Sequence, residues 1–249
     1  MKTKNVNETG HAKNVANFEE LISFTTGYGT AYNPTKTSIK SANLTLVLAN
    51  SKVAVTAVNT AMPAYKNAVA AREAAFEPVS KLMTKVYNAL LATDTTDQVH
   101  DNAKTIIRKL EGRRASKKLS EAEIQALSAQ GENVNQISSS QMSYDNRLDN
   151  LDKLLKLLSS VALYMPNENE LKTATLILLY NDLKAKNSAA LNSIAPISNA
   201  RIARNDVLYK VDTGLVPVAV AVKTYIKSVF GATSPQYRQV SHLKFTSPR

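Results

Sequence analysis

The sequence predicts an all-α protein, an elongated antiparallel helical bundle built from two tandem, structurally related repeats with long kinked helices. Two observations carry this prediction: a long stretch without glycine and a self-similarity along the chain. No glycine occurs between Gly29 and Gly112, and because glycine is the usual residue of turns, its absence favours long helices over short strands. Only Val216 to Val222 alternates as a strand would, and it could equally be a helix that begins at Pro217.

The chain matches itself when it is shifted by 132 residues. The identical pairs between positions 32 and 77 are Tyr32 and Tyr164, Pro34 and Pro166, Lys40 and Lys172, Ala42 and Ala174, Leu44 and Leu176, Leu46 and Leu178, Lys52 and Lys184, Ala57 and Ala189, Asn67 and Asn199, Ala68 and Ala200, Ala71 and Ala203, and Arg72 and Arg204. Composition alone would give about three or four identities over such a stretch. A shift of 133 aligns the preceding segments, and shifts of 139 and 140 align the following ones. We therefore predict two copies, related by an approximate twofold axis or by a translation.

Each copy is expected to begin with an amphipathic helix, at 13–26 and at 145–160. In the second of these helices, leucines form an apolar seam: Leu148, Leu151, Leu154, Leu155, Leu157 and Leu158. A Tyr-x-Pro turn, which begins at Tyr32 or Tyr164, and a long helix follow in each copy. The remaining helices are expected at 78–92, 96–111, 217–230 and 235–243, the last with Ser234 as its N-cap.

The long helix of the first copy carries alanines with a period of about 3.5 residues. This alanine row is Ala57, Ala61, Ala64, Ala68, Ala71 and Ala75. Small residues let two helix axes approach closely, so we expect the row to pack against another long helix. Because the period continues through Pro63, that proline is expected to kink the helix and not to end it, and the same holds for Pro196 in the second copy.

The expected organisation along the chain has four parts. A disordered N-terminus at 1–12 precedes repeat 1 at 13–112, and a polar, basic linker at 113–140 separates it from repeat 2 at 141–249. Within the linker, Ser120 and Glu123 predict the capping box of one short helix.

Composition excludes several classes of function. A chain of 249 residues without cysteine has no disulfide scaffold, iron–sulfur cluster, thiol nucleophile or cysteine-based zinc site. The first 20 residues contain no apolar signal region, and the longest uninterrupted apolar run, near Leu215 to Val222, is too short to span a bilayer. We therefore expect a cytoplasmic protein without a transmembrane segment.

Motifs for catalysis or cofactor binding are scarce. His11, His100 and His242 lack metal-site spacing, and Gly27 to Gly29 lacks the third glycine of a dinucleotide-binding turn. Neither a Walker loop nor a Gly-x-Ser-x-Gly elbow is present. We expect no cofactor, no metal and no enzymatic activity. A site in the bundle core is the alternative, and the acids to consider for it are Glu168, Glu170 and Asp182.

Two polar pairs recur between the copies, Asn67 with Arg72 and Asn199 with Arg204. Arg72 falls on the row of large apolar residues and is expected to point toward an interface. Arginine there can bind a carboxylate or a phosphate with both ends of its guanidinium group, so these four residues are candidates for a partner or anion site. The alternative is a structural role, in which each arginine bonds to helix-end carbonyls or to a neighbouring acid.

Positive charge is concentrated in one segment of a chain whose net charge is +11. This basic cluster consists of Lys104, Arg108, Lys109, Arg113, Arg114, Lys117 and Lys118. The chain after Asp212 contains no acidic residue. Both features are typical of surfaces that contact nucleic acid or a membrane, although a solvated basic face explains them as well.

The segments Gly27 to Pro34, Leu110 to Arg114 and Val229 to Phe245 resemble those of a family of uncharacterised, cysteine-poor bacterial all-helical proteins of about this size. This resemblance implies an all-helical fold and brings no activity, cofactor or catalytic residue. The expected function is that of a non-enzymatic helical-bundle protein, which acts through protein–protein interaction or self-association. The alternative is a basic nucleic-acid-binding protein.

Overall fold

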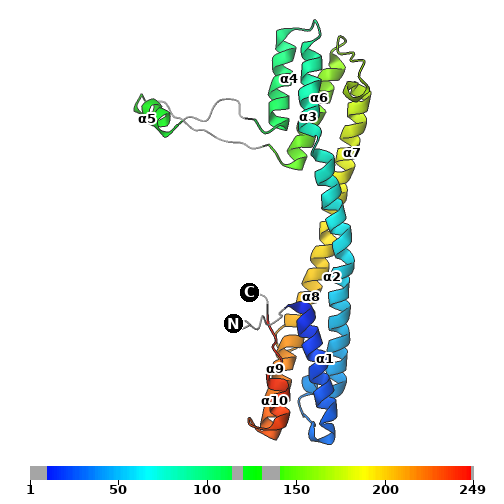
Figure 1. Cartoon of the computed structure of the whole chain (residues 1–249), viewed down its shortest axis with the longest axis vertical. Coiled ribbons are helices and arrows are strands. Elements are labelled where there is room, and N and C mark those ends of the chain that lie inside the picture. Colours follow the sequence, from blue (N-terminus) through cyan, green and yellow to red (C-terminus); the bar gives the residue numbers. More distant parts are fainter. Residues whose placement is uncertain (1–9, 114–119, 131–140, 248–249) are drawn as a thin grey trace, which may run out of the picture. The chain divides into compact units, whose positions relative to one another are not determined.

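The computed structural model describes residues 10–113, 120–130 and 141–247 (Figure 1). Helix makes up 78% of the structure and the described ranges contain no strand, which confirms the prediction of an all-α protein. The helices are α1 (His11–Gly27), α2 (Ser41–Phe76), α3 (Val79–Leu91), α4 (Asp97–Leu110), α5 (Glu121–Ala129), α6 (Tyr144–Ser160), α7 (Thr173–Asn192), α8 (Ile194–Tyr209), α9 (Leu215–Phe230) and α10 (Pro235–Ser241). The alternating Val216 to Val222 segment is helical and lies within α9.

Several helix boundaries follow from side-chain caps. The hydroxyl groups of Ser120, Ser143 and Ser234 each accept a hydrogen bond from the backbone N–H three residues later. The capping box of Ser120 and Glu123 is present in full, as the sequence predicts. Near the N-terminus, α1 begins at His11, although the sequence predicts disorder up to residue 12. Residues 1–9, and 114–119 and 131–140 of the predicted linker, lie outside the described ranges.

Two long, bent helical segments, 41–91 and 173–209, confirm the prediction of long kinked helices. The first passes through Pro63 without ending, as the sequence predicts. The second is divided at Ser193, three residues before Pro196. Ser193 has φ −75° and ψ −13°, close to helical angles, and Pro196 then lies in the first turn of α8, where its missing N–H costs no hydrogen bond.

The chain forms two compact units that do not coincide with its N-terminal and C-terminal halves. Unit 1 consists of Met1–Lys66 and Ser193–Arg249, and unit 2 consists of Asn67–Asn192. Unit 1 therefore contains α1, the beginning of α2, and α8 to α10, while unit 2 contains the end of α2 and α3 to α7. Each unit thus takes helices from both predicted repeats, because α2 extends from one unit into the other.

The core of unit 1 lies between α1, the first part of α2, α8, α9 and α10. Phe18 and Leu21 of α1 are fully buried, and they share one apolar cluster with Leu44 of α2 and Leu215 of α9. Burying a side chain of this size stabilises a fold by about 1.5–3 kcal/mol. Within the alternating segment of α9, Val216, Val218, Ala219 and Val222 are buried in this cluster, whereas Val220 is exposed.

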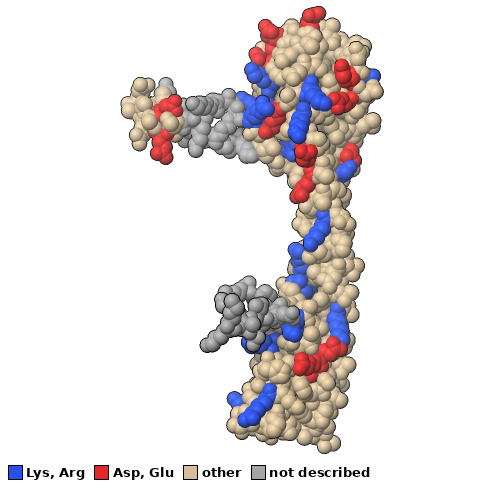
Figure 2. All heavy atoms as spheres, in the orientation of Figure 1, with Lys and Arg blue, Asp and Glu red and all other residues tan. Residues whose placement is uncertain are grey.

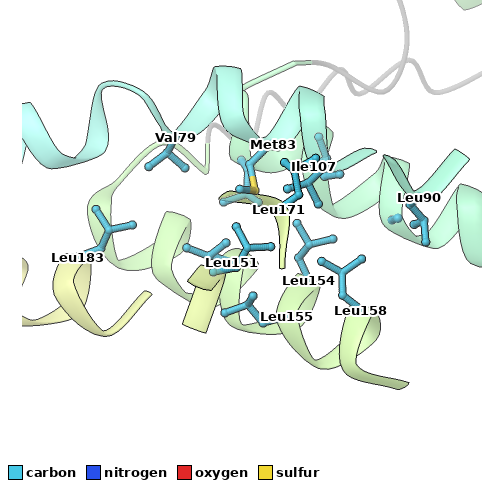
Figure 3. Packing of buried hydrophobic residues seen from close by; sticks show 14 of the residues in the cluster. Val79, Met83, Leu90, Ile107, Leu151, Leu154, Leu155, Leu158, Leu171 and Leu183 are labelled. Carbon is cyan, nitrogen blue, oxygen red and sulfur yellow. The ribbon is translucent and has the colours of Figure 1, made fainter. Parts of the chain in front are cut away.

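The core of unit 2 lies between α3, α4, α6 and α7 (Figure 3). Leu151 and Leu154 of α6 are at most 1% exposed and lie in one cluster with Met83 of α3 and Leu183 of α7. The leucine seam predicted for α6 is confirmed, since its members are buried except Leu157, which is partly buried. Leucines at three- and four-residue spacing bury one whole side of this helix.

One local structure occurs in both units. Tyr32 of unit 1 donates a hydrogen bond through Oη to the carbonyl oxygen of Ile39 at 2.6 Å, and Tyr164 of unit 2 donates one to Leu171 at 2.9 Å. Each bond closes a loop that ends in a 3₁₀ turn, Thr37–Ile39 or Asn169–Leu171. Burial raises the pKa of both phenols, that of Tyr164 to about 12. Both hydroxyl groups therefore remain hydrogen-bond donors at neutral pH.

The alanine row of α2 is not the buried side of the helix. Within the row, Ala57, Ala64 and Ala71 are exposed and Ala61, Ala68 and Ala75 are half-buried, whereas Ala54 and Val58 outside the row are buried. The expectation that this row packs closely against another long helix is therefore wrong. The buried side of α2 carries Ala54, Val58 and Phe76, so an alanine is buried where it lies in line with larger apolar residues.

Candidate functional site

Arg72 lies at the centre of a polar cluster in unit 2. Its Nη1 donates a hydrogen bond to Oδ1 of Asn187 at 3.2 Å, and Nδ2 of Asn187 donates one to Oδ1 of Asp145 at 2.8 Å. The guanidinium group stacks on Tyr144, with Cζ 4.0 Å from the ring centroid. Since Arg72 is on α2, Asn187 on α7 and Tyr144 and Asp145 on α6, the cluster joins three helices.

A second arginine extends this cluster. Nη2 of Arg147 donates to the carbonyl oxygen of Phe76 at 2.9 Å, and its guanidinium lies over the Phe76 ring at 5.0 Å. Phe76 meets the Tyr144 ring edge-on at 4.9 Å. Burial lowers the pKa of Arg147. The Phe76 carbonyl is at the C-terminal end of α2, where a cation also interacts favourably with the helix dipole.

The cluster has the chemistry of a structural joint more than that of a binding site. The Nε atoms of both Arg72 and Arg147 are buried and have no hydrogen-bond partner within the described residues. Arg72 uses an amide and an aromatic ring as partners, which hold its position without neutralising its charge. A buried Nε is also closed to an anion from solvent, so these contacts favour the structural alternative weighed for Arg72.

The corresponding arginine of unit 1 has different surroundings. Arg204 donates from Nε and Nη2 to Oδ1 of its sequence neighbour Asn205, at 3.2 and 2.8 Å. Nearby, Nδ1 of His11 lies 2.7 Å from Oη of Tyr209, which also accepts a bond from Asn14 at 3.3 Å. Burial, and next the charge of Arg204, lower the pKa of His11. Burial also lowers the pKa of Arg204.

The two predicted asparagines do not belong to these clusters. Asn67 and Asn199 are exposed, whereas Arg72 and Arg204 are half-buried. The structure brings Arg72 together with Asn187 and not with Asn67. The shift of 133 residues could have indicated the positions that face the arginines, because it aligns His11 with Tyr144 and Asn14 with Arg147. Their contacts could not be read from the sequence, since the residue types differ between the copies.

The predicted basic cluster is only partly described and partly neutralised. Lys104, Arg108 and Lys109 lie on α4, and Nε of Arg113 forms an ion pair with Oε2 of Glu111 at 3.1 Å. Arg108 and Lys109 are half-buried. The other predicted members lie outside the described residues: Arg114, Lys117 and Lys118. The described part of the cluster is therefore a short basic edge of α4 and not a continuous stripe.

The acids considered for a core site are on the surface. Glu168 and Glu170 line a hollow of about 720 Å³ beside the end of α3, where Glu170 forms an ion pair with Nζ of Lys85 at 2.8 Å. Asp182 pairs with Lys186 on the same helix. Among the described residues, no group of three or more histidine, aspartate or glutamate side chains could hold a metal ion.

One helical segment, Ser41–Leu91, has the length and mean hydropathy of a membrane-spanning helix. In this segment serine, threonine and asparagine separate the apolar residues, so it contains no long uninterrupted apolar run. In its most apolar window, 17% of the residues are buried. The core helix of a soluble protein passes the same test, so length and hydropathy do not place this helix in a membrane. They do identify an apolar surface.

The comparisons with known proteins add no assignment. The chain matches no family model, no curated protein and no solved structure.

Proposed function

We propose that the protein is a non-enzymatic helical module, produced by duplication of one helical unit, that acts by associating with a second copy of itself. The observation that carries this proposal is the exposed apolar side of the long helices. Leu46 on α2 is 57% exposed and Leu178 on α7 is 69% exposed. An exposed leucine is ordinary, but here it occurs at the same place in both copies.

The duplication is supported by several paired features. The buried leucines Leu44 and Leu176 correspond at a shift of 132, as do the hydrogen-bonded tyrosines Tyr32 and Tyr164. The 3₁₀ turns and the first residues of α2 and α7 are displaced by the same number. A shared shift in buried contacts and in helix boundaries is what two copies of one ancestral unit would retain.

A second copy is the partner that fits this surface best. Val53, in line with Leu46 on α2, is 69% exposed and lines a shallow groove of about 580 Å³. Ala57 and Ala61 line the same groove and belong to the alanine row. Small residues at a 3.5-residue period accept another helix at close range, and α2 itself carries the matching pattern.

Sedimentation velocity over a range of protein concentrations tests the proposal. The wild type should show a concentration-dependent dimer. Replacing Leu46→Glu and Leu178→Glu together should weaken association about tenfold or more, because each glutamate would be buried without a partner in the interface.

The matched control places two glutamates on exposed polar positions of α2, Thr45→Glu and Asn59→Glu. This variant has the same change in net charge and should associate as the wild type does. A monomeric wild type at every concentration, or equal effects of the two variants, would overturn the proposal. Circular dichroism of both variants confirms that helix content is unchanged.

A further inference from the structure

The two units differ sharply in charge. Unit 1 contains 15 lysines and arginines and five aspartates and glutamates, whereas unit 2 contains 16 and 15. Unit 1 therefore carries +10 of the net charge of +11. This division is invisible along the sequence, because unit 1 combines the two ends of the chain. On the face drawn in Figure 2, lysine and arginine outnumber acids around α1, α9 and α10, and the two kinds are mixed around α3, α4, α6 and α7.

The cations of unit 1 also have few acidic partners. In its described residues, the lysines with an ion pair are Lys52, which meets Glu19, and Lys210, which meets Asp206 at 3.9 Å. In the described part of unit 2, five lysines and arginines form such pairs: Lys85, Arg113, Lys153, Lys156 and Lys186. Most positive charge of unit 1 is thus not compensated within the unit.

Several of these cations lie together on α9, α10 and the segment that follows. Lys227 of α9 is 5.7 Å from the Tyr237 ring of α10. Lys223, one turn earlier, donates to the carbonyl oxygens of Ser241 at 3.1 Å and Leu243 at 2.9 Å. Tyr237 and Leu243 are the sequence neighbours of Arg238 and Lys244, whose side chains are exposed like that of Lys227. We define the α9–α10 basic surface as Lys223, Lys227, Arg238 and Lys244.

Acidic groups are scarce around this surface. No aspartate or glutamate follows Asp212 in the sequence, so α9, α10 and the segment after them contain none. On the neighbouring helix α1, Glu20 lies 3.8 Å from Nε2 of His242, and Glu19 is paired with Lys52. The positive potential of the α9–α10 basic surface is therefore only weakly offset by its surroundings.

We propose that the α9–α10 basic surface binds the phosphate backbone of nucleic acid. Lys227, Arg238 and Lys244 supply the cations that contact phosphates, while Lys223 holds the segment after α10 in place through its two hydrogen bonds. The exposed polar side chains around them, including Thr224, are the kind that hydrogen-bond to phosphate and sugar. This function is independent of the proposed self-association.

The same side chains favour nucleic acid over a membrane surface. A helix that lies on a membrane presents a continuous apolar face with large or aromatic residues. On α9 and α10, the large apolar residues described as exposed are Val220 and Val229. The aromatic residues Phe230, Tyr237 and Phe245 pack against the core of unit 1 instead. Because no aromatic ring projects freely for base stacking, binding should show little sequence preference.

Fluorescence anisotropy with a labelled duplex DNA of mixed sequence and the full-length protein tests this proposal. With three phosphate contacts, from Lys227, Arg238 and Lys244, affinity should fall about 40-fold between 50 and 200 mM salt. The variant Lys227→Gln, Arg238→Gln, Lys244→Gln should bind at least about tenfold more weakly at 50 mM salt, with the slope of log K against log salt smaller by about three.

The matched control removes three positive charges from the predicted cluster on α4: Lys104→Gln, Arg108→Gln and Lys109→Gln. Its net charge equals that of the first variant, and it should bind as the wild type does. Equal losses in both variants, a loss in the α4 variant alone, or no binding of duplex DNA at 50 mM salt would overturn the proposal.

A flotation assay with vesicles that contain an anionic phospholipid separates nucleic acid from membrane. The proposal expects no co-flotation that depends on Lys227, Arg238 and Lys244. Vesicle binding lost in the same triple variant, together with an absence of DNA binding, would assign the α9–α10 basic surface to lipid instead.

Discussion

Arg72 and Arg204 occupy corresponding positions in the long helices, yet the two units use them differently. In unit 2, Arg72 is held by Asn187 and Tyr144 from two other helices. In unit 1, Arg204 bonds to Asn205 on its own helix, and valine at position 55 occupies the place that corresponds to Asn187. Two arginines at matching positions of the chain thus have different roles, because each role depends on the side chains around it and these differ. The net charge of the two units differs as well, since unit 1 carries +10 of the total of +11.

The largest difference between the units is expected when the amide partner of each arginine is removed. Asn187→Ala should lower the free energy of unfolding by about 1–3 kcal/mol, because it removes a buried amide that bonds to two charged groups, half-buried Arg72 and exposed Asp145. Asn205→Ala, at an exposed position, should change it by less than about 0.5 kcal/mol. Urea denaturation measures both values. Equal values would remove the distinction drawn between the two arginines.

A smaller effect, equal in the two units, is expected at the shared turn. Tyr32→Phe and Tyr164→Phe each remove one phenol hydrogen bond to a backbone carbonyl and should each cost about 0.5–1.5 kcal/mol. The two changes should be additive in the double variant, since the two tyrosines belong to different apolar clusters. If one substitution were neutral while the other was costly, the turn would not be an equivalent element of both copies.

The smallest effect is a pH dependence that belongs to unit 1. Burial and the charge of Arg204 lower the pKa of His11 in the folded chain. Below about pH 6.5, His11 therefore binds a proton more readily in the unfolded chain than in the folded chain. The contribution of neutral His11 to the free energy of unfolding is therefore complete above this pH and is lost as the pH falls. The urea midpoint of the wild type should decrease from pH 7.5 to 5.5 more than that of His11→Gln. Identical decreases would show that His11 does not contribute.

Local features of the fold were predictable because they depend on residues near one another in the chain. The leucine spacing of α6 predicts the side that is buried, and Ser120 and Glu123 predict a capping box. The proline in α2 was also assigned correctly, because the apolar period continues beyond it. The alanine row of α2 has a regular period without being buried, because periodicity alone does not say which side of a helix faces the core.

The candidate site was less predictable than the fold. Arg72 was identified from the repeat, but its contacts with Asn187 and Tyr144 join residues more than seventy positions apart, and no local pattern indicates them. The basic residues of α4 were evident as a run in the sequence, whereas those of α9, α10 and Lys244 are spread among other residues. Charge density along a chain is a poor guide to charge density on a surface when distant segments pack together.

By itself, the sequence determined that this protein is helical and roughly where several of its helices begin and end, and it contains a set of identical residues at a shift of 132. These properties follow from backbone preferences, side-chain caps and periodic burial within single helices. Only the tertiary structure decided that each compact unit combines helices from both repeats, that Arg72 is held by neutral partners, and that nearly all net charge belongs to unit 1. The physical reason is that packing and electrostatic fields act through space, between side chains that the order of the chain keeps far apart.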